Sequence, residues 1–165
     1  MKHDACVARL EKKLSLDRQQ LIEFLDAVMA GFVEELVRKG ELSVKGLGLF
    51  TVLYLPFRSK VDGRVMKAFP PRKKIAFYTR PVVDTATLRI IGRKTGLSER
   101  DADTFFRILS GHFRERLAAK QELLLEGLGV FRTVEGKYLF VPDEPLQEIV
   151  NNVFENMQIL DLGGQ

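Results

Sequence analysis

The chain repeats part of its own sequence at a fixed spacing of 81 residues, and this repeat limits its possible folds more than any other feature. Residues 42–50 return as residues 123–131, and both segments end in a Gly-x-Gly-x-Phe pattern. The same spacing relates four further apolar pairs, namely Leu16 and Leu97, Phe24 and Phe105, Phe32 and Phe113, and Leu36 and Leu117. A module of ~80 residues buries only a modest share of its surface, so two such modules are expected to pair or stack.

The repeat predicts two modules, residues 1–83 and residues 84–165, and these modules differ in charge. The first has 16 lysines and arginines against 9 aspartates and glutamates, a net charge of +7. The second has 10 against 13, a net charge of −3, and together they give the +4 of the whole chain. The function is therefore expected to lie in what the modules do together and in how they differ.

Composition favours a soluble globular protein. Hydrophobic residues make up 45% of the chain, and no apolar run is long enough to cross a membrane. The first residues contain no apolar run of signal-peptide length, so export is not expected. Cys6 is the single cysteine, which excludes an intrachain disulfide and fits a reducing compartment. We therefore expect a cytoplasmic protein with no membrane partner.

Two helices are predicted to begin the first module. A helix over residues 4–14 can be capped by Asp4, and the capping-box pattern of Asp17 and Gln20 predicts a long helix that ends at Gly40. The apolar residues of the long helix cover more than the ~100° stripe that a lone surface helix needs. This helix is therefore expected to pack on its own sheet and also on a second module or subunit. The alternative is a fully internal helix of one larger domain.

After the second helix the apolar period becomes that of strands. Strands are predicted over residues 41–45 and 49–57, joined by the Gly-x-Gly turn. The Asp-Gly pair at residues 62–63 is typical of a two-residue hairpin turn, so the chain should reverse there and return through residues 65–78. The first module therefore carries a protruding β-ribbon, called the arm here, at about residues 56–72.

The second module repeats the helices and the sheet but lacks the arm. A helix that begins at Asp84 or Thr85 is followed by one that Ser98 can cap. Its last two strands are joined by a bare Glu-Gly turn at residues 135–136, and a closing helix is predicted over residues 146–159. The predicted fold class is α+β, with two tandem modules that each place a helix pair before a three-stranded antiparallel sheet.

Basic residues are concentrated on the arm and its base. Between residues 58 and 80 the only acidic residue is Asp62. The basic residues of this segment are Arg58, Lys60, Arg64, Lys67, Arg72, Lys73, Lys74 and Arg80. Such a ribbon is stabilised by a polyanion, and duplex DNA offers one negative charge per ~1.7 Å of axis. The alternative is a solvated hairpin whose charges merely prevent edge-to-edge pairing.

The order of these features is similar to that of the bacterial HU and integration host factor family of DNA-bending proteins. The resemblance is carried by Gly46-Leu47-Gly48-Leu49-Phe50, by Pro70, Lys73 and Ala76-Phe77 on the return strand, and by Leu16 with Asp17 between the helices. It covers the first module closely and the second as an HU-like copy without an arm. In that family two subunits interlock, and two arms reach around the duplex in its minor groove.

The resemblance implies a sequence-tolerant, histone-like protein of the nucleoid that binds double-stranded DNA mainly through the arm, with or without bending it. The four basic residues between Arg58 and Lys67 are expected in or over the minor groove, those from Arg72 to Lys74 on phosphates at the arm base, and Arg80 on the flank. Backbone N–H groups of Gly46 and Gly48 are implied as further phosphate contacts. Both an intrachain pseudo-dimer and a homodimer with two arms remain open.

The arm departs from the family at its tip. The family places an Arg-Asn-Pro sequence there, and its proline wedges between base pairs, whereas this chain has Val-Asp-Gly-Arg at residues 61–64. The resemblance therefore does not extend to kinking by proline insertion. Val65, Met66 or Phe69 could act as a wedge, and the alternative is that they pack the two legs of the arm together.

Enzyme chemistry finds little support in the sequence. His3 and His112 belong to different predicted elements, and neither lies in a cluster with metal-ligand spacing. The Gly-x-Gly turn joins two strands and opens no helix, so it is no dinucleotide-binding motif. We expect no enzymatic activity, no cofactor, no metal and no small-molecule substrate. The alternative to DNA binding is a structural adaptor with the same fold, whose basic hairpin meets an acidic protein.

Overall fold

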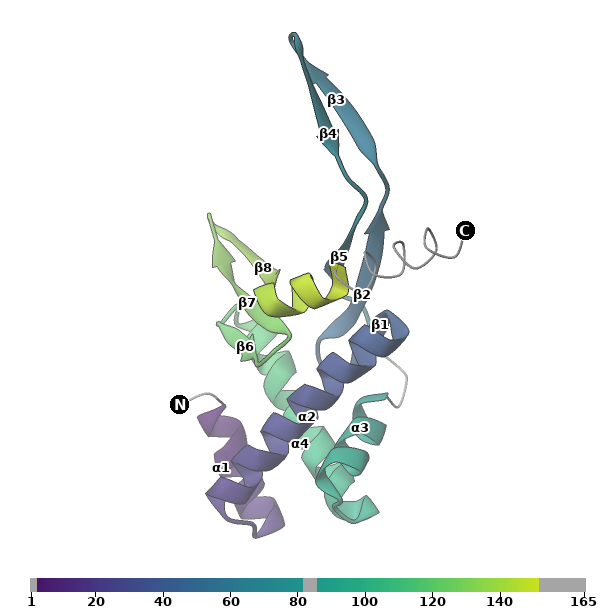
Figure 1. Cartoon of the computed structure of the whole chain (residues 1–165). Coiled ribbons are helices and arrows are strands. Elements are labelled where there is room, and N and C mark those ends of the chain that lie inside the picture. Colours follow the sequence, from purple (N-terminus) through teal and green to yellow (C-terminus); the bar gives the residue numbers. More distant parts are fainter. Residues whose placement is uncertain (1–2, 82–85, 152–165) are drawn as a thin grey trace, which may run out of the picture.

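The computed structural model describes residues 3–81 and 86–151, and Figure 1 shows the arrangement of the chain. The first half contains two helices and five strands: α1 (Asp4–Leu14), α2 (Arg18–Lys39), β1 (Glu41–Val44), β2 (Gly48–Leu55), β3 (Arg58–Asp62), β4 (Val65–Phe69) and β5 (Arg72–Tyr78). Strands β1, β2 and β5 form an antiparallel sheet in the order β1-β2-β5, and β3 pairs with β4 alone. The predicted sheet and hairpin are therefore present.

The second half repeats this order without the β3–β4 ribbon. Its elements are α3 (Ala86–Thr95), α4 (Glu99–Ala118), β6 (Leu123–Leu125), β7 (Gly129–Val134) and β8 (Lys137–Pro142), followed by a helix over residues 144–151. Strands β6, β7 and β8 form a second antiparallel sheet. The predicted helix start at Asp84 or Thr85 and the end of the closing helix beyond residue 151 lie outside the described residues. The α+β class is confirmed.

Local sequence signals set most helix ends. The Asp17 side chain accepts a hydrogen bond from the Gln20 backbone N–H at 2.8 Å, and Ser98 caps α4 in the same way through Asp101. Gly40 ends α2 with a φ of 78°, the left-handed conformation that glycine adopts without steric cost. The prediction that Asp4 caps α1 is wrong, because His3 occupies the cap position and Asp4 is the first helical residue.

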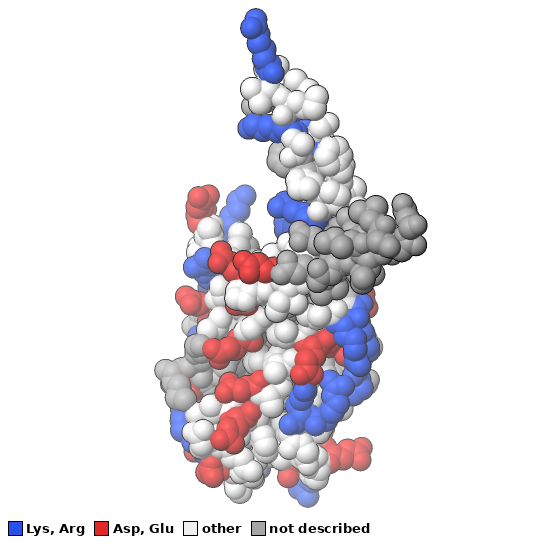
Figure 2. All heavy atoms as spheres, viewed as in Figure 1, with Lys and Arg blue, Asp and Glu red and all other residues white. Residues whose placement is uncertain are grey.

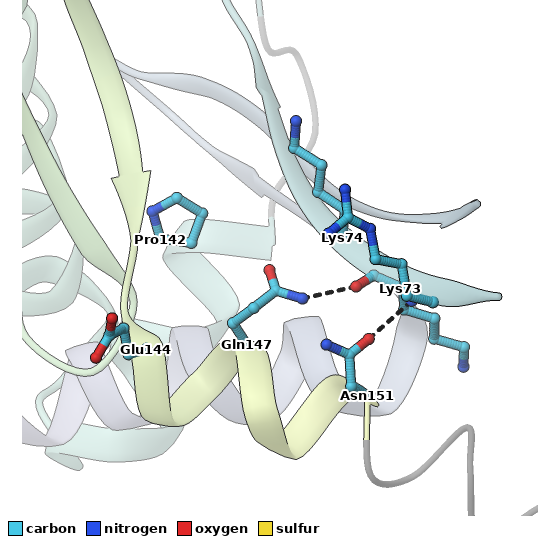
Figure 3. A pocket seen from close by; sticks show the side chains of 7 residues that line it. Lys73, Lys74, Pro142, Glu144, Gln147 and Asn151 are labelled. Atoms are coloured by element: carbon cyan, nitrogen blue, oxygen red, sulfur yellow. Dashed lines mark hydrogen bonds between the residues drawn. The ribbon is translucent and has the colours of Figure 1, made fainter. Parts of the chain in front are cut away.

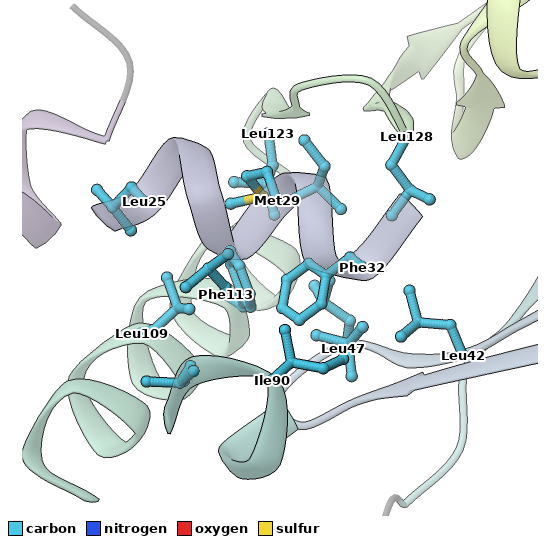
Figure 4. Close-up of a cluster of buried hydrophobic side chains, with 14 of the residues drawn as sticks. Leu25, Met29, Phe32, Leu42, Leu47, Ile90, Leu109, Phe113, Leu123 and Leu128 are labelled. Carbon is cyan, nitrogen blue, oxygen red and sulfur yellow. The ribbon is translucent and has the colours of Figure 1, made fainter. Parts of the chain in front are cut away.

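Helices from the two halves pack against each other. Helix α1 contacts α4, and α2 contacts α3, so the wide apolar stripe of α2 is covered by a helix of the second half as well as by the first sheet. Figure 4 shows Phe32 of α2 between Ile90 of α3 and residues of both sheets. The buried side chains of both halves form one hydrophobic cluster. Removing this apolar surface from water is the main stabilising contribution to the fold.

Four phenylalanines join the two sheets. Phe50 and Phe77 face each other across β2 and β5, and Phe131 and Phe140 do so across β7 and β8. Within the halves, the ring centroids are 4.8 Å apart for Phe50 and Phe77 and 5.0 Å apart for Phe131 and Phe140. Between the halves, they are 4.8 Å apart for Phe77 and Phe131 and 5.0 Å apart for Phe50 and Phe140. These separations are typical of favourable tilted and edge-to-face aromatic contacts. The two sheets are therefore held in a nearly symmetric relation.

The glycine turn between β1 and β2 fits tightly against the second half. Gly46 has a φ of 94°, and a Cβ at this position would lie 2.4 Å from the carbonyl oxygen of Ser110 in α4. At Gly48 a Cβ would lie 2.3 Å from the carbonyl oxygen of Tyr78. Both glycines are required by the close approach of backbone, which is the structural reason for the repeated Gly-x-Gly pattern.

Side chains of the closing helix cover the outer edge of the first sheet. The Gln147 side chain donates to the Lys73 carbonyl oxygen at 2.6 Å and accepts from the Ile75 backbone N–H at 3.2 Å. One helical turn later, Asn151 accepts from the Lys73 backbone N–H at 2.8 Å. Two amide side chains thus replace the missing neighbour of the edge strand β5, as Figure 3 shows.

Candidate nucleic-acid interface

The arm is a regular two-stranded ribbon that projects from the body, beyond the shorter β7–β8 hairpin (Figure 1). Asp62 pairs with Val65, so the two-residue loop consists of Gly63 and Arg64. The prediction that Asp62 and Gly63 form the loop is wrong by one residue. Gly63 has a φ of 65°. A type II′ hairpin turn needs a positive φ at its first loop position, where glycine is preferred.

Cations gather on one face of the ribbon. Residues directly opposite each other in an antiparallel pair share a face, and successive residues alternate between faces. Lys60 is paired with Lys67, and Arg58 lies on the same face two residues before Lys60. All three cations are exposed, as is Arg64 at the tip, and Asp62, whose side chain lies outside the described residues, occupies the next position of this face. Like charges directly opposite destabilise a hairpin, so this face has an electrostatic cost that a polyanion would remove.

The other face of the ribbon is small and apolar. It carries Ser59 paired with Ala68, and Val61 paired with Met66. The exposed fractions are 67% for Val61 and 70% for Met66. Val65, on the basic face near the tip, is 59% exposed, and the side chain of Phe69 lies outside the described residues. That Val65, Met66 or Phe69 acts as a wedge, or that they pack the two legs together, both stay predictions.

At the base of the arm the predicted basic cluster divides between two faces of β5. Arg72 is paired with Leu55 and Lys74 with Leu53, so these two cations share a face. Lys73 is paired with Tyr54 and points the other way, as Figure 3 shows. All three cations also line a hollow between the two halves, which Glu144, Gln147 and Asn151 border from the closing helix. Arg72 and Lys74 are exposed, whereas Lys73 is half-buried.

The remaining predicted contacts lie at the far end of the sheet. Gly46 and Gly48 occupy the β1–β2 turn, and the arm leaves the sheet at the other end of β2. Arg80 follows β5, whose last residue Tyr78 is paired with Leu49 beside that turn. The structure therefore brings these three residues together with each other and not with the arm, and phosphate contact by the two glycines stays a prediction.

The charges of the arm differ from those of the body in how they are neutralised. On the body, some cations pair with carboxylates: Arg18 with Asp4 at 2.6 Å, and Lys94 with Glu34 at 2.9 Å. On the arm, among the described side chains, neither Lys60 nor Lys67 forms an ion pair. Figure 2 shows cations along the projecting arm and mixed charge over the body. Several body cations, among them Lys12, Lys13 and Arg132, also form no ion pair with a described side chain, so the arm is set apart by the direct opposition of its two lysines.

A buried carboxylate organises further cations at the side of the body. Glu35 has 4% of its side chain exposed and accepts from Arg89 of α3 at 2.6 Å, with Arg38 at 3.1 Å and Lys39 at 3.3 Å. Burial opposes ionisation, but the hydrogen bonds from Arg89 and Lys39 outweigh it and lower the pKa of Glu35. The ion pair between Glu35 and Arg89 links α2 to α3, so it is a structural contact between the two halves.

Sequence reasoning missed two features beside the arm base. Gln147 and Asn151 are the first, and their only signal is the spacing of two amides by four residues on one face of a helix. The second is a pair of exposed cations, Arg132 and Lys137, on one face of the β7–β8 hairpin. The second half therefore presents basic residues of its own on its sheet, which the net charge of −3 conceals.

The described residues outside the arm offer little for catalysis. Burial raises the pKa of the Cys6 thiol to about 12, so it is not a reactive thiolate. His3 Nδ1 lies 3.1 Å from His112 Nε2, and burial of His112, together with the charge of His3, lowers its pKa to about 4. Within residues 3–81 and 86–151, no group of three or more acidic, histidine or cysteine side chains could hold a metal ion. No helix of this part is both long and apolar enough to cross a membrane.

No protein-family model matches the chain, and the comparison with curated proteins found no match. The functional interpretation therefore depends on the geometry of this molecule. A projecting ribbon with an exposed basic face can bind phosphate groups, and with two cations at its base it can follow a polyanion over several charges.

Proposed function

We propose that this protein binds double-stranded DNA as a sequence-tolerant architectural protein, with two HU-like modules paired within one chain. The observation that carries the proposal is the direct opposition of Lys60 and Lys67 on an exposed arm, where neither lysine forms an ion pair with a described side chain. A fold that only needed a soluble hairpin could alternate the signs of these residues and avoid the repulsion.

Binding is mainly electrostatic in this proposal. Arg58, Lys60, Arg64 and Lys67 of the arm follow the backbone along the minor groove, while Arg72 and Lys74 contact phosphates at the arm base and Arg80 lies on the flank. Each neutralised phosphate releases condensed counterions, so affinity falls steeply as salt rises. Base edges are not read by these contacts, and different sequences are bound alike.

The contacts between halves support a pseudo-dimer with one arm in each molecule. The pairings α1–α4 and α2–α3 and the four phenylalanines join the halves of one chain, so no second chain is needed to complete the core. A single arm reaches around the duplex from one side only. With Gly63 and Arg64 at the tip, the proposal includes no kinking by a proline wedge.

The test is a titration of the protein with a short duplex at about 50 mM and 200 mM salt, followed by fluorescence anisotropy. We expect tight binding at low salt and a loss of about a thousand-fold at high salt, which is the effect of about six phosphate contacts. The double variant Arg72→Glu/Lys74→Glu should weaken binding to every sequence alike and flatten the salt dependence by about 2 in the log–log slope. Salt-independent or absent binding would reject the proposal.

The matched control is Lys12→Glu/Lys13→Glu, which makes the same change of charge at two exposed residues in the last turn of α1. This control distinguishes a loss of DNA affinity caused by missing contacts at the arm base from a loss caused only by the lower net charge of the protein. Equal losses for the two double variants would show that DNA responds only to the overall charge, and the assignment to the arm base would fail.

An adaptor function is favoured by one separate observation, the exposed apolar residues of the arm. Phe57 is 60% exposed at the start of the arm, and Val61 and Met66 are more exposed still. Such residues suit contact with a protein surface. Deletion of residues 58–69 distinguishes the two functions. Loss of DNA affinity would support DNA binding, whereas unchanged DNA affinity together with loss of a protein contact would support the adaptor function.

A further inference from the structure

The strand that carries the cations of the arm base begins where its sheet is interrupted. Strand β5 is an edge strand of the sheet β1-β2-β5, and its pairing with β2 stops at Arg72. The two preceding residues, Pro70 and Pro71, have no backbone N–H to donate to a neighbouring strand. Pairing resumes only in the separate ribbon β3–β4. Arg72 and Lys74 therefore lie at an end of the sheet that would fray without further contacts.

Two amide side chains of the second half hold this strand at its open edge. Gln147 donates to the Lys73 carbonyl oxygen at 2.6 Å, and Asn151 accepts from the Lys73 N–H at 2.8 Å. Gln147 also accepts from the Ile75 N–H at 3.2 Å. Figure 3 shows both amides on the side of the closing helix that is turned toward β5. Both backbone groups of Lys73 are thus bound by the second half.

These hydrogen bonds determine how the strand is held on either side of Lys73. Successive residues of an antiparallel strand direct their backbone groups to opposite edges. Because Lys73 directs both of its groups to the closing helix, Arg72 and Lys74 direct theirs to β2. The strand is therefore held from both edges. The side chains of Arg72 and Lys74 leave it on one exposed face.

We propose that Gln147 and Asn151 are positioning residues for DNA binding. They hold the strand in the conformation in which Arg72 and Lys74 reach phosphates. A strand that is already ordered loses less conformational entropy when DNA binds, so its affinity is higher. This inference rests on the proposed DNA binding. It assigns a part in that binding to the armless second half, whose closing helix orders the arm base of the first half.

The test compares the whole wild-type chain with the double variant Gln147→Met/Asn151→Leu. Methionine and leucine keep about the size of the two amides, and they remove the hydrogen bonds without changing the net charge. The variant should bind a short duplex about five- to thirty-fold more weakly, which is the effect of having to order roughly one more residue of backbone. Unchanged affinity would overturn the proposal.

The salt dependence separates positioning from a loss of charge contacts. Between about 50 mM and 200 mM salt, the double variant should keep the log–log slope of the wild type, because the same phosphates are contacted once the strand is ordered. Arg72→Glu/Lys74→Glu should flatten this slope instead. An equally flattened slope in the amide variant would overturn the proposal, since contacts would then be lost outright.

Amide hydrogen exchange of the free protein gives a readout that does not depend on DNA. In the double variant, the N–H groups of Arg72 and Lys74 should exchange at least about five-fold faster, although they face β2 and not the substituted side chains. Unchanged exchange at these two residues would overturn the proposal, because β2 alone would then hold the strand. If the wild type does not bind DNA, the proposed function fails, and hydrogen exchange still decides whether the amides order the strand.

The control for lost stability is Val28→Ala. Val28 is fully buried in the middle of α2, so its truncation lowers the free energy of unfolding through the core. At a temperature where all variants are folded, Val28→Ala should bind DNA like the wild type and leave exchange at Arg72 and Lys74 unchanged relative to the rest of the sheet. An equal loss of DNA affinity in Val28→Ala and in the amide variant would overturn the proposal, because affinity would then follow overall stability alone.

Discussion

Lys60 and Lys67 face each other directly across the two strands of the arm, where a pair of opposite charges would be more stable. The arm therefore gives up some hairpin stability for a concentrated positive face. This relationship separates the requirements of folding from those of binding, because one substitution should move them in opposite directions.

The substitution is Lys60→Glu. It replaces a repulsive cross-strand pair with an attractive one, which should stabilise the hairpin by about 0.2–1 kcal/mol. At the same time it removes a cation from the DNA-facing surface, so affinity should fall and the log–log salt slope should flatten by about 1. Amide hydrogen exchange of the arm and anisotropy with duplex DNA check the two effects. Lys67→Glu is the matched variant, and a joint rise or joint fall of stability and affinity would contradict the interpretation.

The second prediction concerns the edge of the first sheet. Gln147→Ala removes one donor and one acceptor, and leaves the Lys73 carbonyl and the N–H of the buried Ile75 without these partners. We expect a loss of about 1–3 kcal/mol in the free energy of unfolding, measured with urea. Glu148→Ala, at the exposed neighbouring position, should change it by less than about 0.5 kcal/mol. Equal effects of the two variants would show that the amide contributes nothing specific.

The third prediction is a pH dependence of stability from His112. Its pKa is lowered from an ordinary value of 6.5 to about 4, first by burial and then by the charge of His3. Between these values the unfolded chain binds more protons than the folded one, so stability falls as pH drops from 6.5 to 4. The shift corresponds to a loss of up to about 3 kcal/mol over this window. Urea unfolding at several pH values should show this slope in the wild type and a clearly smaller one in His112→Gln.

The fourth prediction compares two glycines. In Gly46→Ala the alanine would have to adopt a left-handed conformation, and its Cβ would lie 2.4 Å from the Ser110 carbonyl oxygen. We therefore expect the free energy of unfolding to fall by more than about 1 kcal/mol. Gly111→Ala lies within α4, where a Cβ meets nothing within 4 Å, and should stabilise the protein by about 0.5–1 kcal/mol. Thermal unfolding measures both. A tolerated Gly46→Ala would show that the β1–β2 turn can move away from α4.

The sequence predicted those parts of the fold that depend on neighbouring residues. Helix caps at Asp17 and Ser98 and the helix end at Gly40 follow from side chains and conformations within one turn, and all three are present. The change after Gly40 from the helical spacing of apolar residues to that of strands could likewise be read from neighbouring residues. The exposed basic arm followed from its charge and from the hairpin signal, although the position of the loop did not.

The loop shows why side-chain pairing was harder to predict. A loop at Asp62 and Gly63 would have placed Lys60 opposite Val65, but the observed loop moves Lys67 into that position. A shift of one residue in the turn moves the register by two, so cross-strand neighbours cannot be read from a pattern that is uncertain by one position. The two faces of β5, and with them the separation of Lys73 from Arg72 and Lys74, depend on register in the same way.

Contacts between distant segments had no local signal. Gln147 and Asn151 were expected only as polar positions of a closing helix, because nothing near them indicates an open strand edge.

The hydrogen bonds between Gln147 and Lys73 join residues 74 positions apart, and they also order events during synthesis. When the first half leaves the ribosome, its outermost strand has an open edge, and the helix that covers this edge has not yet been translated. The nascent chain must therefore keep that edge from other strands until Gln147 and Asn151 have been translated. A fragment that ends before Gln147 would keep this edge open, and an open strand edge favours aggregation.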